Sequence, residues 1–223
     1  METGATSTPA LRPELEALPP RIRRLPVDDR GYPVPWFVAW LRGKPEFRAM
    51  DPKKFVLAVR ERRCWVCGQA LGVYLVFVVG PMCGINRTTA EPPSHLECAQ
   101  WSVRNCPFMS RPQMVRREDE LTRSCEGNVA GEMIKRNPGV TLLWICNDYS
   151  VFGDRQGRPL LRMGDAVRVE WWREGRHATR AEVLESVDTG LPALRGMAEQ
   201  EGNGALNELE QKKGALEALY PAA

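Results

Sequence analysis

Hydrophobic residues in this chain gather in short runs that predict β-strands. The longest run, LGVYLVFVV at residues 71–79, is rich in β-branched and aromatic side chains and ends at a Gly-Pro pair. Such a run is typical of a buried strand or a tight hairpin. A second run, VTLLWIC, covers residues 140–146, and two more strands are expected at 160–163 and 166–172. In the last of these, apolar and charged residues alternate, which indicates a strand with one buried face.

Other stretches carry the signals of helices. Asp51 is placed to cap a helix that opens with Pro52 and extends to about Arg62, because a carboxylate accepts hydrogen bonds from exposed backbone amides and proline fits the first helical position. Ser94 is the expected cap of a second helix. Residues 95–106 place their apolar side chains on one side of that helix.

The remaining elements are a hairpin and the C-terminal helices. The apolar stretch WFVAW at 36–40 and the residues after the turn at 43–45 predict a short hairpin. Thr179 and Glu182 form a capping box that begins a helix, and Gly190 is expected to end it. The last thirty residues predict one or two amphipathic helices.

These elements predict an α+β protein in which a treble-clef-like zinc element is joined to a small mixed strand and helix region. The prolines near the N-terminus break helical patterns there. The expected segments are a flexible N-terminal arm at 1–30, a zinc-binding treble-clef-like region at 31–110, an irregular loop at 111–139, a strand and helix region at 140–190 packed on it, and a C-terminal helical tail at 191–223.

One group of side chains has the spacing of a metal site. Cys64, Cys67, His95 and Cys98 follow the pattern C-x2-C-x27-H-x2-C. Two cysteines separated by two residues form a tight turn that directs both sulfurs inward, and His95 and Cys98 are close on one face of the predicted helix. A turn, a β segment and a helix that carries two ligands are similar to a treble-clef zinc finger. We therefore expect Zn²⁺ at this site.

Four protein ligands fill a tetrahedral shell, so the expected zinc is structural rather than catalytic. Cys83 is an alternative to His95 as a ligand, because the end of the preceding strand can return to the turn. Cys106 lies too far along the helix from Cys98 to share the ion, and neither Cys125 nor Cys146 has a partner at a ligand spacing. No catalytic residue is assigned.

An enzymatic alternative is a divergent HNH-like metal-dependent nuclease. In that class a zinc turn supports a strand, loop and helix unit with catalytic histidines, and Asn86 and His95 match part of the pattern. The chain has only two histidines, and Met82 and Cys83 stand where the class has a histidine at the strand end. This departure makes a binding protein the preferred interpretation.

Charge suggests what such a protein would bind. The net charge is +3, with the positive excess in residues 1–140. Arginine suits bidentate contacts with phosphate or carboxylate groups, and Arg87 is also placed to pair internally with Glu91. The candidate binding residues near the zinc site are Arg62, Arg63, Asn86, Arg87, Arg104 and Arg111. They predict a surface for nucleic acid or for another protein.

Several short motifs carry a resemblance to a protein group. They are W-V-C-G at 65–68, G-P-M-C at 80–83, I-N-R at 85–87, E-P-P-S-H-L-E-C-A at 91–99 and C-P-F at 106–108. With them the chain resembles a group of uncharacterised phage and prophage proteins, from the P-V-D-D-R-G-Y-P-V-P-W-F segment to the W-W-R-E-G-R run. The resemblance covers most of the chain and implies a phage origin and a shared zinc-like motif.

The sequence thus predicts a phage-type accessory protein with structural zinc and with nucleic acid or a host protein as its partner. No segment approaches the roughly 18 apolar residues of a membrane span, and no secretory signal is found, so the expected location is the host cytoplasm. The sequence does not determine an oligomeric state.

Overall fold

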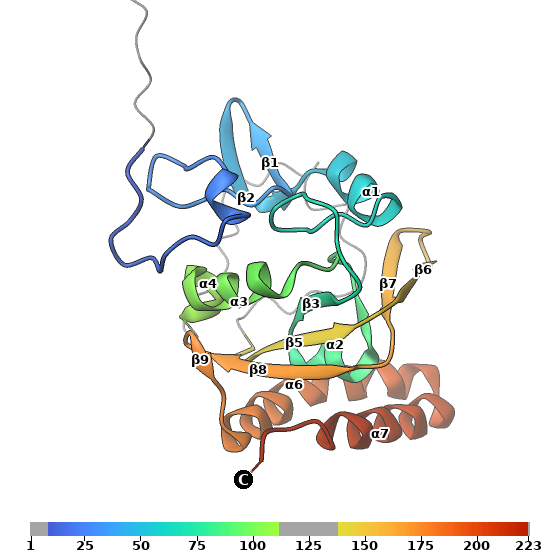
Figure 1. Cartoon of the computed structure of the whole chain (residues 1–223). Coiled ribbons are helices and arrows are strands. Elements are labelled where there is room, and N and C mark those ends of the chain that lie inside the picture. Colours follow the sequence, from blue (N-terminus) through green and yellow to red (C-terminus); the bar gives the residue numbers. More distant parts are fainter. Residues whose placement is uncertain (1–8, 112–137, 223) are drawn as a thin grey trace, which may run out of the picture.

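The computed structural model describes residues 9–111 and 138–222 and shows an α+β fold (Figure 1). The helices and strands in these residues are η1 Ile22–Arg24, β1 Val38–Leu41, β2 Lys44–Met50, α1 Pro52–Arg60, β3 Leu75–Val79, α2 Pro81–Asn86, β4 Thr88–Thr89, α3 Leu96–Asn105, α4 Pro107–Ser110, β5 Thr141–Cys146, β6 Tyr149–Gly153, β7 Pro159–Met163, β8 Arg168–Arg173, β9 Arg176–His177, α6 Arg180–Glu201 and α7 Asn203–Glu217.

The central element is an antiparallel sheet with strand order β3-β5-β8-β9. Every residue of β5 is buried. Leu142 and Trp144 contact one hydrophobic cluster, and Leu143 and Ile145 contact another. Because alternate side chains of a strand point to opposite faces, this arrangement explains the continuous apolar run in the sequence.

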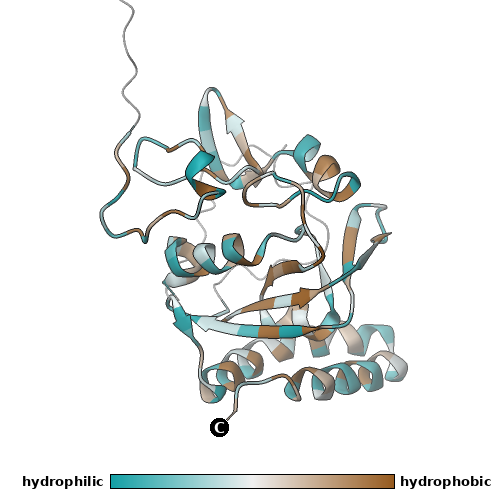
Figure 2. Ribbon diagram, viewed as in Figure 1, coloured by the Kyte–Doolittle hydropathy of each residue, from teal (hydrophilic) through white to brown (hydrophobic). Residues whose placement is uncertain are grey.

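Helices cover both faces of this sheet. The larger cluster lies between β3, β5 and β8 on one side and α2, α6 and α7 on the other. On the opposite face α3 packs Ala99 and Val103 against Val76 of β3. In Figure 1 α6 and α7 lie together beneath the sheet, and Figure 2 shows the hydrophobic character of β3 and β5. The core is thus a layered one, with the sheet in the middle.

A second sheet has the order β4-β7-β6. The strand expected at 160–163 is confirmed as β7. The sequence does not predict strand β6, because its residues are exposed or half-buried and their pattern carries little burial signal. The indole of Trp144 donates to the carbonyl oxygen of Gly164 at 2.9 Å and so connects β5 to the segment after β7.

The predicted hairpin is confirmed as β1 and β2, which form a two-stranded sheet of their own. Leu41 pairs with Lys44, so the connecting turn consists of Arg42 and Gly43. Both have positive φ, at 50° and 79°, as a type I′ turn requires. This conformation is easy for glycine but costs about 1–2 kcal/mol for a residue with a side chain.

The first two helices begin close to where the sequence predicts. Asp51 caps α1, and its carboxylate accepts hydrogen bonds from the amides of Lys53 and Lys54. The cap residue of α3 is His95 rather than Ser94, and Ser94 instead pairs with Val76 through backbone hydrogen bonds. The prediction of Ser94 as the cap is wrong by one residue, because the backbone of Ser94 pairs with β3 and the helix begins after His95.

The helix that begins with the Thr179 and Glu182 capping box is confirmed, but its predicted end is wrong. It continues through Gly190 and Pro192 to Glu201. A Cβ atom at Gly190 would lie 3.0 Å from atoms of the Met82 side chain, which shows that this glycine permits close packing of α6 on α2. Tertiary contact therefore outweighs the helix-stopping tendency of glycine here.

The segment expected to be a flexible arm is partly built into the fold. Ile22 is fully buried, and the amide of Arg12 donates to the carbonyl of Gly31. Residues of this segment within 9–30 thus pack on the fold, while residues 1–8 lie outside the described chain. Residues 112–137, most of the predicted loop at 111–139, also lie outside it. Among the described helices, none combines the length and the apolar character needed to cross a membrane.

Candidate metal centre

The first half of the site is a tight turn at Cys64–Cys67. The amide of Cys67 donates to the sulfur of Cys64 at 3.4 Å, and the amide of Gly68 donates to the carbonyl of Cys64 at 2.8 Å. Gly68 has a φ of +74°, which reverses the chain, and Arg63 and Ala70 then form a bridge. This geometry directs both cysteine sulfurs to the inside of the turn.

The second half of the site is the start of α3. Its residues His95 and Cys98 occupy the cap and the first turn. The amide of His95 donates to the sulfur of Cys64 at 3.4 Å, so the helix start is fixed directly to the turn. Unpaired amides at a helix N-terminus also favour negative charge, and thiolates next to them benefit.

The four predicted ligands come together in the structure. The donor atoms of Cys64, Cys67, His95 and Cys98 all lie within 4.8 Å of one another. Nδ1 of His95 is 3.4 Å from the sulfur of Cys67 and 4.0 Å from that of Cys98. Among the described residues, no other group of three or more cysteine, histidine or acidic side chains is close enough to hold a metal ion.

The orientation of the imidazole suits metal binding through Nδ1. Nε2 of His95 lies 3.0 Å from the carbonyl oxygen of Ala70. A carbonyl oxygen only accepts hydrogen bonds, so this contact places the proton of the neutral ring on Nε2. The lone pair of Nδ1 then faces the three sulfurs. Contacts of this kind fix the tautomer of metal-binding histidines.

The four side chains also perturb one another's protonation. Hydrogen bonds with Cys64 and Cys67 raise the pKa of His95 to about 10. Burial opposes ionisation of Cys64, but hydrogen bonds from Cys67, Cys98 and His95 outweigh it and lower the pKa of Cys64. The pKa of Cys98 is raised, because Cys64 and Cys67 hydrogen-bond to it and it is buried.

Residues from the N-terminal segment enclose the site. Ile22 packs with Val66, Trp101 and the three cysteines, and Leu15, Leu18, Leu25 and Leu71 surround this cluster. Arg21 forms an ion pair with Glu97 at 2.6 Å. The pKa of Arg21 is raised chiefly by the hydrogen bond to Glu97 and also by the charges of Cys67 and Cys98. The guanidinium is therefore held chiefly by Glu97, with a weaker attraction to the sulfurs.

The turn of the site also supports the β1–β2 hairpin. Trp65 stacks on Phe37 with ring centroids 4.9 Å apart and contacts Trp36 and Phe55 edge to face. The amide of Trp36 donates to the carbonyl of Val66 at 2.7 Å. The base of the hairpin is thereby attached to the two residues between Cys64 and Cys67.

The other described cysteines lie elsewhere. Cys83 is on α2, where it packs against the main core and burial raises its pKa to about 11. It is not among the clustered donors, so the structure supports His95 rather than Cys83. The thiol of Cys146 donates to the carbonyl of Asp148. Cys106 follows α3, and burial raises its pKa as well. Cys125 lies outside the described residues.

The expected treble clef is not confirmed. Between the cysteine turn and α3 the chain forms β3, α2 and β4, and all these residues are described. The two strands pair with β5 and β7 rather than with each other, so no hairpin precedes the helix that carries the ligands. The site shares the ligand order of a treble clef, but its strands belong to larger sheets.

The nuclease alternative gains no support from this geometry. Both ring nitrogens of His95 are engaged, one by the sulfurs and one by Ala70. The second histidine, His177, packs its ring on Trp172 at a centroid distance of 4.2 Å. Asn86 ends α2, and its carbonyl accepts a hydrogen bond from Thr88. His95 is therefore unavailable as a general base.

The predicted binding arginines have separate environments. Arg62 donates to the carbonyl of Asn147, and Arg63 pairs with Glu61. Arg87 pairs with Asp165 at 2.6 Å, not with the Glu91 partner considered from the sequence.

The last two candidate arginines lie beyond the metal ligands on α3: Arg104 is in the last turn of α3, and Arg111 follows α4. Arg104 pairs with Glu16 at 2.7 Å, and Arg111 lines the same small cavity as Arg104. The six candidate residues therefore do not form one demonstrated surface.

Sequence reasoning missed the supporting residues. Trp65 stands in a short sequence motif, but its role beneath the hairpin depends on Trp36 and Phe37, far away in the chain. The close approach at Gly68, where a Cβ atom would lie 2.6 Å from the Trp36 ring, leaves no local pattern either. The glycine after the second cysteine is the available signal for the tight turn.

Comparisons with family models, curated proteins and solved structures found no match to this chain.

Proposed function

We propose that the cluster is a structural Zn²⁺ centre in a phage-type accessory binding protein. The observation that carries the zinc proposal is the convergence of three sulfurs and one imidazole nitrogen within 4.8 Å. Around tetrahedral zinc, with Zn–S near 2.3 Å and Zn–N near 2.0 Å, neighbouring ligand atoms lie about 3.5–3.8 Å apart. The separations of 3.4 and 4.0 Å around Nδ1 of His95 bracket this range.

The donor set supports a structural role. Three thiolates and a neutral imidazole complete the coordination of Zn²⁺ and leave no position for water. The complex would carry one net negative charge, to which the nearby Arg21 guanidinium would be weakly attracted. Bound zinc would join two parts of the chain, the cysteine turn and the start of α3, and the N-terminal residues around Ile22 pack over them. Its chemical contribution is therefore to folding.

Metal analysis and cysteine variants test this proposal. Protein purified without added metal should contain about one zinc per chain, and Co²⁺ substitution should give the visible absorption of tetrahedral thiolate coordination. Cys64→Ser should abolish both signals. Cys146→Ser is the matched control, because Cys146 is equally buried but lies outside the cluster, and it should keep both. A stable wild type without metal would refute the zinc centre.

The partner that we propose is nucleic acid or a host protein, with the host cytoplasm as the location. The phage-type role is supported by the sequence resemblance, and partner binding is supported by the large apolar side chains exposed on the surface, such as Trp40 and Tyr74. Affinity purification from the host, with and without nuclease treatment, tests this. A partner lost on nuclease treatment indicates nucleic acid, and a retained one indicates protein. Recovery of neither would refute the binding role.

A further inference from the structure

We propose that the tip of the β1–β2 hairpin is a contact surface for single-stranded nucleic acid, on which Trp40 stacks with a base and Arg42 and Lys44 contact phosphates. This inference rests on the proposed binding role and selects nucleic acid as the partner. It uses residues other than those predicted from the sequence. Base stacking on aromatic rings combined with nearby positive charge is the usual mode of binding single strands.

The backbone at the turn is the first observation. Four residues other than glycine have positive φ in the described chain: Arg42, Arg62, Arg87 and Glu174. Three of them have a contact that accounts for the side chain, since Arg62 donates to Asn147, Arg87 pairs with Asp165, and Glu174 pairs with Arg173. Arg42 has no hydrogen bond, ion pair or ring contact among the described residues.

The choice of arginine at this position is therefore not explained by folding. Type I′ turns favour Asn or Gly at the position of Arg42, because those residues tolerate positive φ. A residue held in an unfavourable backbone conformation, whose solvent-exposed side chain forms no hydrogen bond, ion pair or ring contact with the described residues, is better explained by contact with another molecule.

The exposure of Trp40 is the second observation. Its exposed fraction is 46%, and that of the neighbouring Leu41 is 41%. Trp65, Trp101, Trp144, Trp171 and Trp172 are all buried, at 7% or less. Trp40 thus presents a large aromatic surface beside the unpaired arginine.

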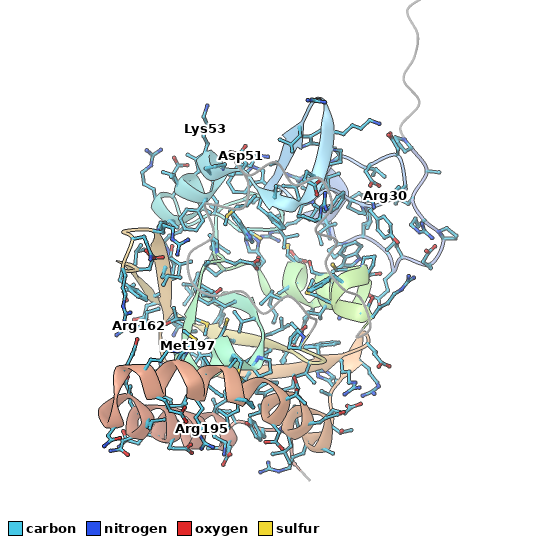
Figure 3. All side chains as sticks on the ribbon, turned by 180° about the vertical axis from the view of Figure 1, so that it is seen from behind. Arg30, Asp51, Lys53, Arg162, Arg195 and Met197 are labelled. Atoms are coloured by element: carbon cyan, nitrogen blue, oxygen red, sulfur yellow. The ribbon has the colours of Figure 1, made fainter. Side chains whose placement is uncertain are left out.

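Unpaired positive charge continues around the tip. Lys44 follows the turn, and Lys53 extends from the start of α1 at the same end of the molecule (Figures 1 and 3). Neither side chain forms an ion pair within the described residues. By contrast, Arg48 on the same hairpin pairs with Glu46 at 2.8 Å. Arg42 and Lys44 are thus unpaired cations on either side of Gly43 at the tip, where a polyanion would neutralise them.

The order of residues favours nucleic acid over a membrane surface. A hairpin that dips into a bilayer places apolar residues deepest and cations behind them at the headgroup level. Here the outermost residues are Arg42 and Gly43, and Trp40 and Leu41 lie behind them. Trp40 and Leu41 are also adjacent on a strand and so point to opposite faces. One indole beside leading cations suits a base and its flanking phosphates.

The hairpin is attached rigidly enough to present this surface. Its base packs through Trp36 and Phe37 on Trp65, which lies between the cysteines of the metal centre. The turn that holds the metal ligands thus also sets the direction of the hairpin. Little backbone ordering would be needed on binding, which favours affinity.

Fluorescence anisotropy with the zinc-loaded full chain and a labelled mixed-sequence single strand tests the proposal. Trp40→Ala should weaken binding about 5- to 150-fold, as expected for one lost stacking contact, without changing the salt dependence. Arg42→Ala combined with Lys44→Ala should lower the slope of log K against log salt by about 1.4, because each phosphate contact contributes about 0.7. Arg155→Ala is the matched control. Arg155 is an exposed arginine in another hairpin, paired with Glu201, and its loss should change neither quantity.

The measurements distinguish a failure of the hairpin proposal from a failure of the zinc proposal. Zinc content and circular dichroism are measured on every variant, so that a loss of binding in a folded, zinc-containing protein is assigned to the tip. The hairpin proposal is overturned by absent strand binding, by unchanged binding of the Trp40 and Arg42/Lys44 variants, or by preference for phosphatidylserine vesicles. Strand binding by a metal-free wild type would support the tip while overturning the zinc centre alone.

Discussion

Gly68→Ala should destabilise the protein more than Gly43→Ala, although both replace a glycine with positive φ by the same residue. Gly68 has φ +74° and Gly43 has φ +79°. The two positions differ in their surroundings. A Cβ atom at Gly68 would lie 2.6 Å from the ring of Trp36, whereas no atom of the described residues lies within 4 Å of one at Gly43.

The expected losses of unfolding free energy follow from two effects, the positive φ and the space around the added Cβ atom. The left-handed backbone costs a residue with a side chain about 1–2 kcal/mol, and both variants bear this. Ordinary contacts of a Cβ begin near 3.4 Å, so a methyl group added at Gly68 would have to displace the Trp36 ring, and overpacking of this kind costs about 1–3 kcal/mol more. We expect about 1–2 kcal/mol for Gly43→Ala and about 2–5 kcal/mol for Gly68→Ala.

Equilibrium urea unfolding measures this difference. Both variants and the wild type are compared at the same excess of zinc, because bound metal adds to the measured free energy of unfolding. Thermal midpoints should follow in the same order, since about 1 kcal/mol corresponds to about 2–4 °C in a chain of this size. Equal destabilisation by the two substitutions would refute the close packing of Trp36 on the turn that holds the metal ligands.

Three further predictions concern the core, pH and metal removal. Leu142→Ala, in a fully buried position of β5, should lower the free energy of unfolding by about 2–5 kcal/mol in urea titrations, whereas Val151→Ala, at 49% exposure, should change it by less than about 0.5 kcal/mol. The hydrogen bond from Arg176, with that from the Thr179 amide, lowers the pKa of Glu182 to about 2, so its stabilising effect is complete above about pH 4.5 and lost as pH falls towards 2. The stability difference between wild type and Glu182→Gln should therefore shrink across that interval, and a constant difference would contradict this. Chelation of zinc should lower the thermal midpoint and change tryptophan fluorescence through Trp65, and an unchanged spectrum would argue against coupling between metal and hairpin.

The ligand cluster is accessible from the sequence because its information is local. Two short spacings place Cys64 with Cys67 and His95 with Cys98, and the hydrophobic run between the pairs implies that the chain can return. Capping residues such as Asp51 and Thr179 mark helix starts for the same reason, since a cap acts within three residues. Interactions of short range in the chain leave a pattern that can be read directly.

Features that depend on distant contacts are missed or misplaced. The continuation of α6 through Gly190 depends on packing against Met82, which no local pattern contains. The burial of Ile22 arises because it covers the cysteines of the metal site. The ion pairs of the candidate arginines depend on tertiary structure too, since Arg104 and Glu16 are far apart in sequence. Side-chain partners of this kind are decided by tertiary structure.

The position of β5 in the chain has a consequence for synthesis on the ribosome. β5 begins at residue 141, 62 residues after its neighbour β3 ends at residue 79. At typical elongation rates of about 5–20 residues per second, the apolar strand β3 has no strand partner for about 3–12 s. Within that interval α3 emerges, and the ligands His95 and Cys98 can fix it to the cysteine turn so that it covers Val76. Zinc supply during translation would then govern how much newly made chain escapes aggregation, apart from any effect on the finished protein.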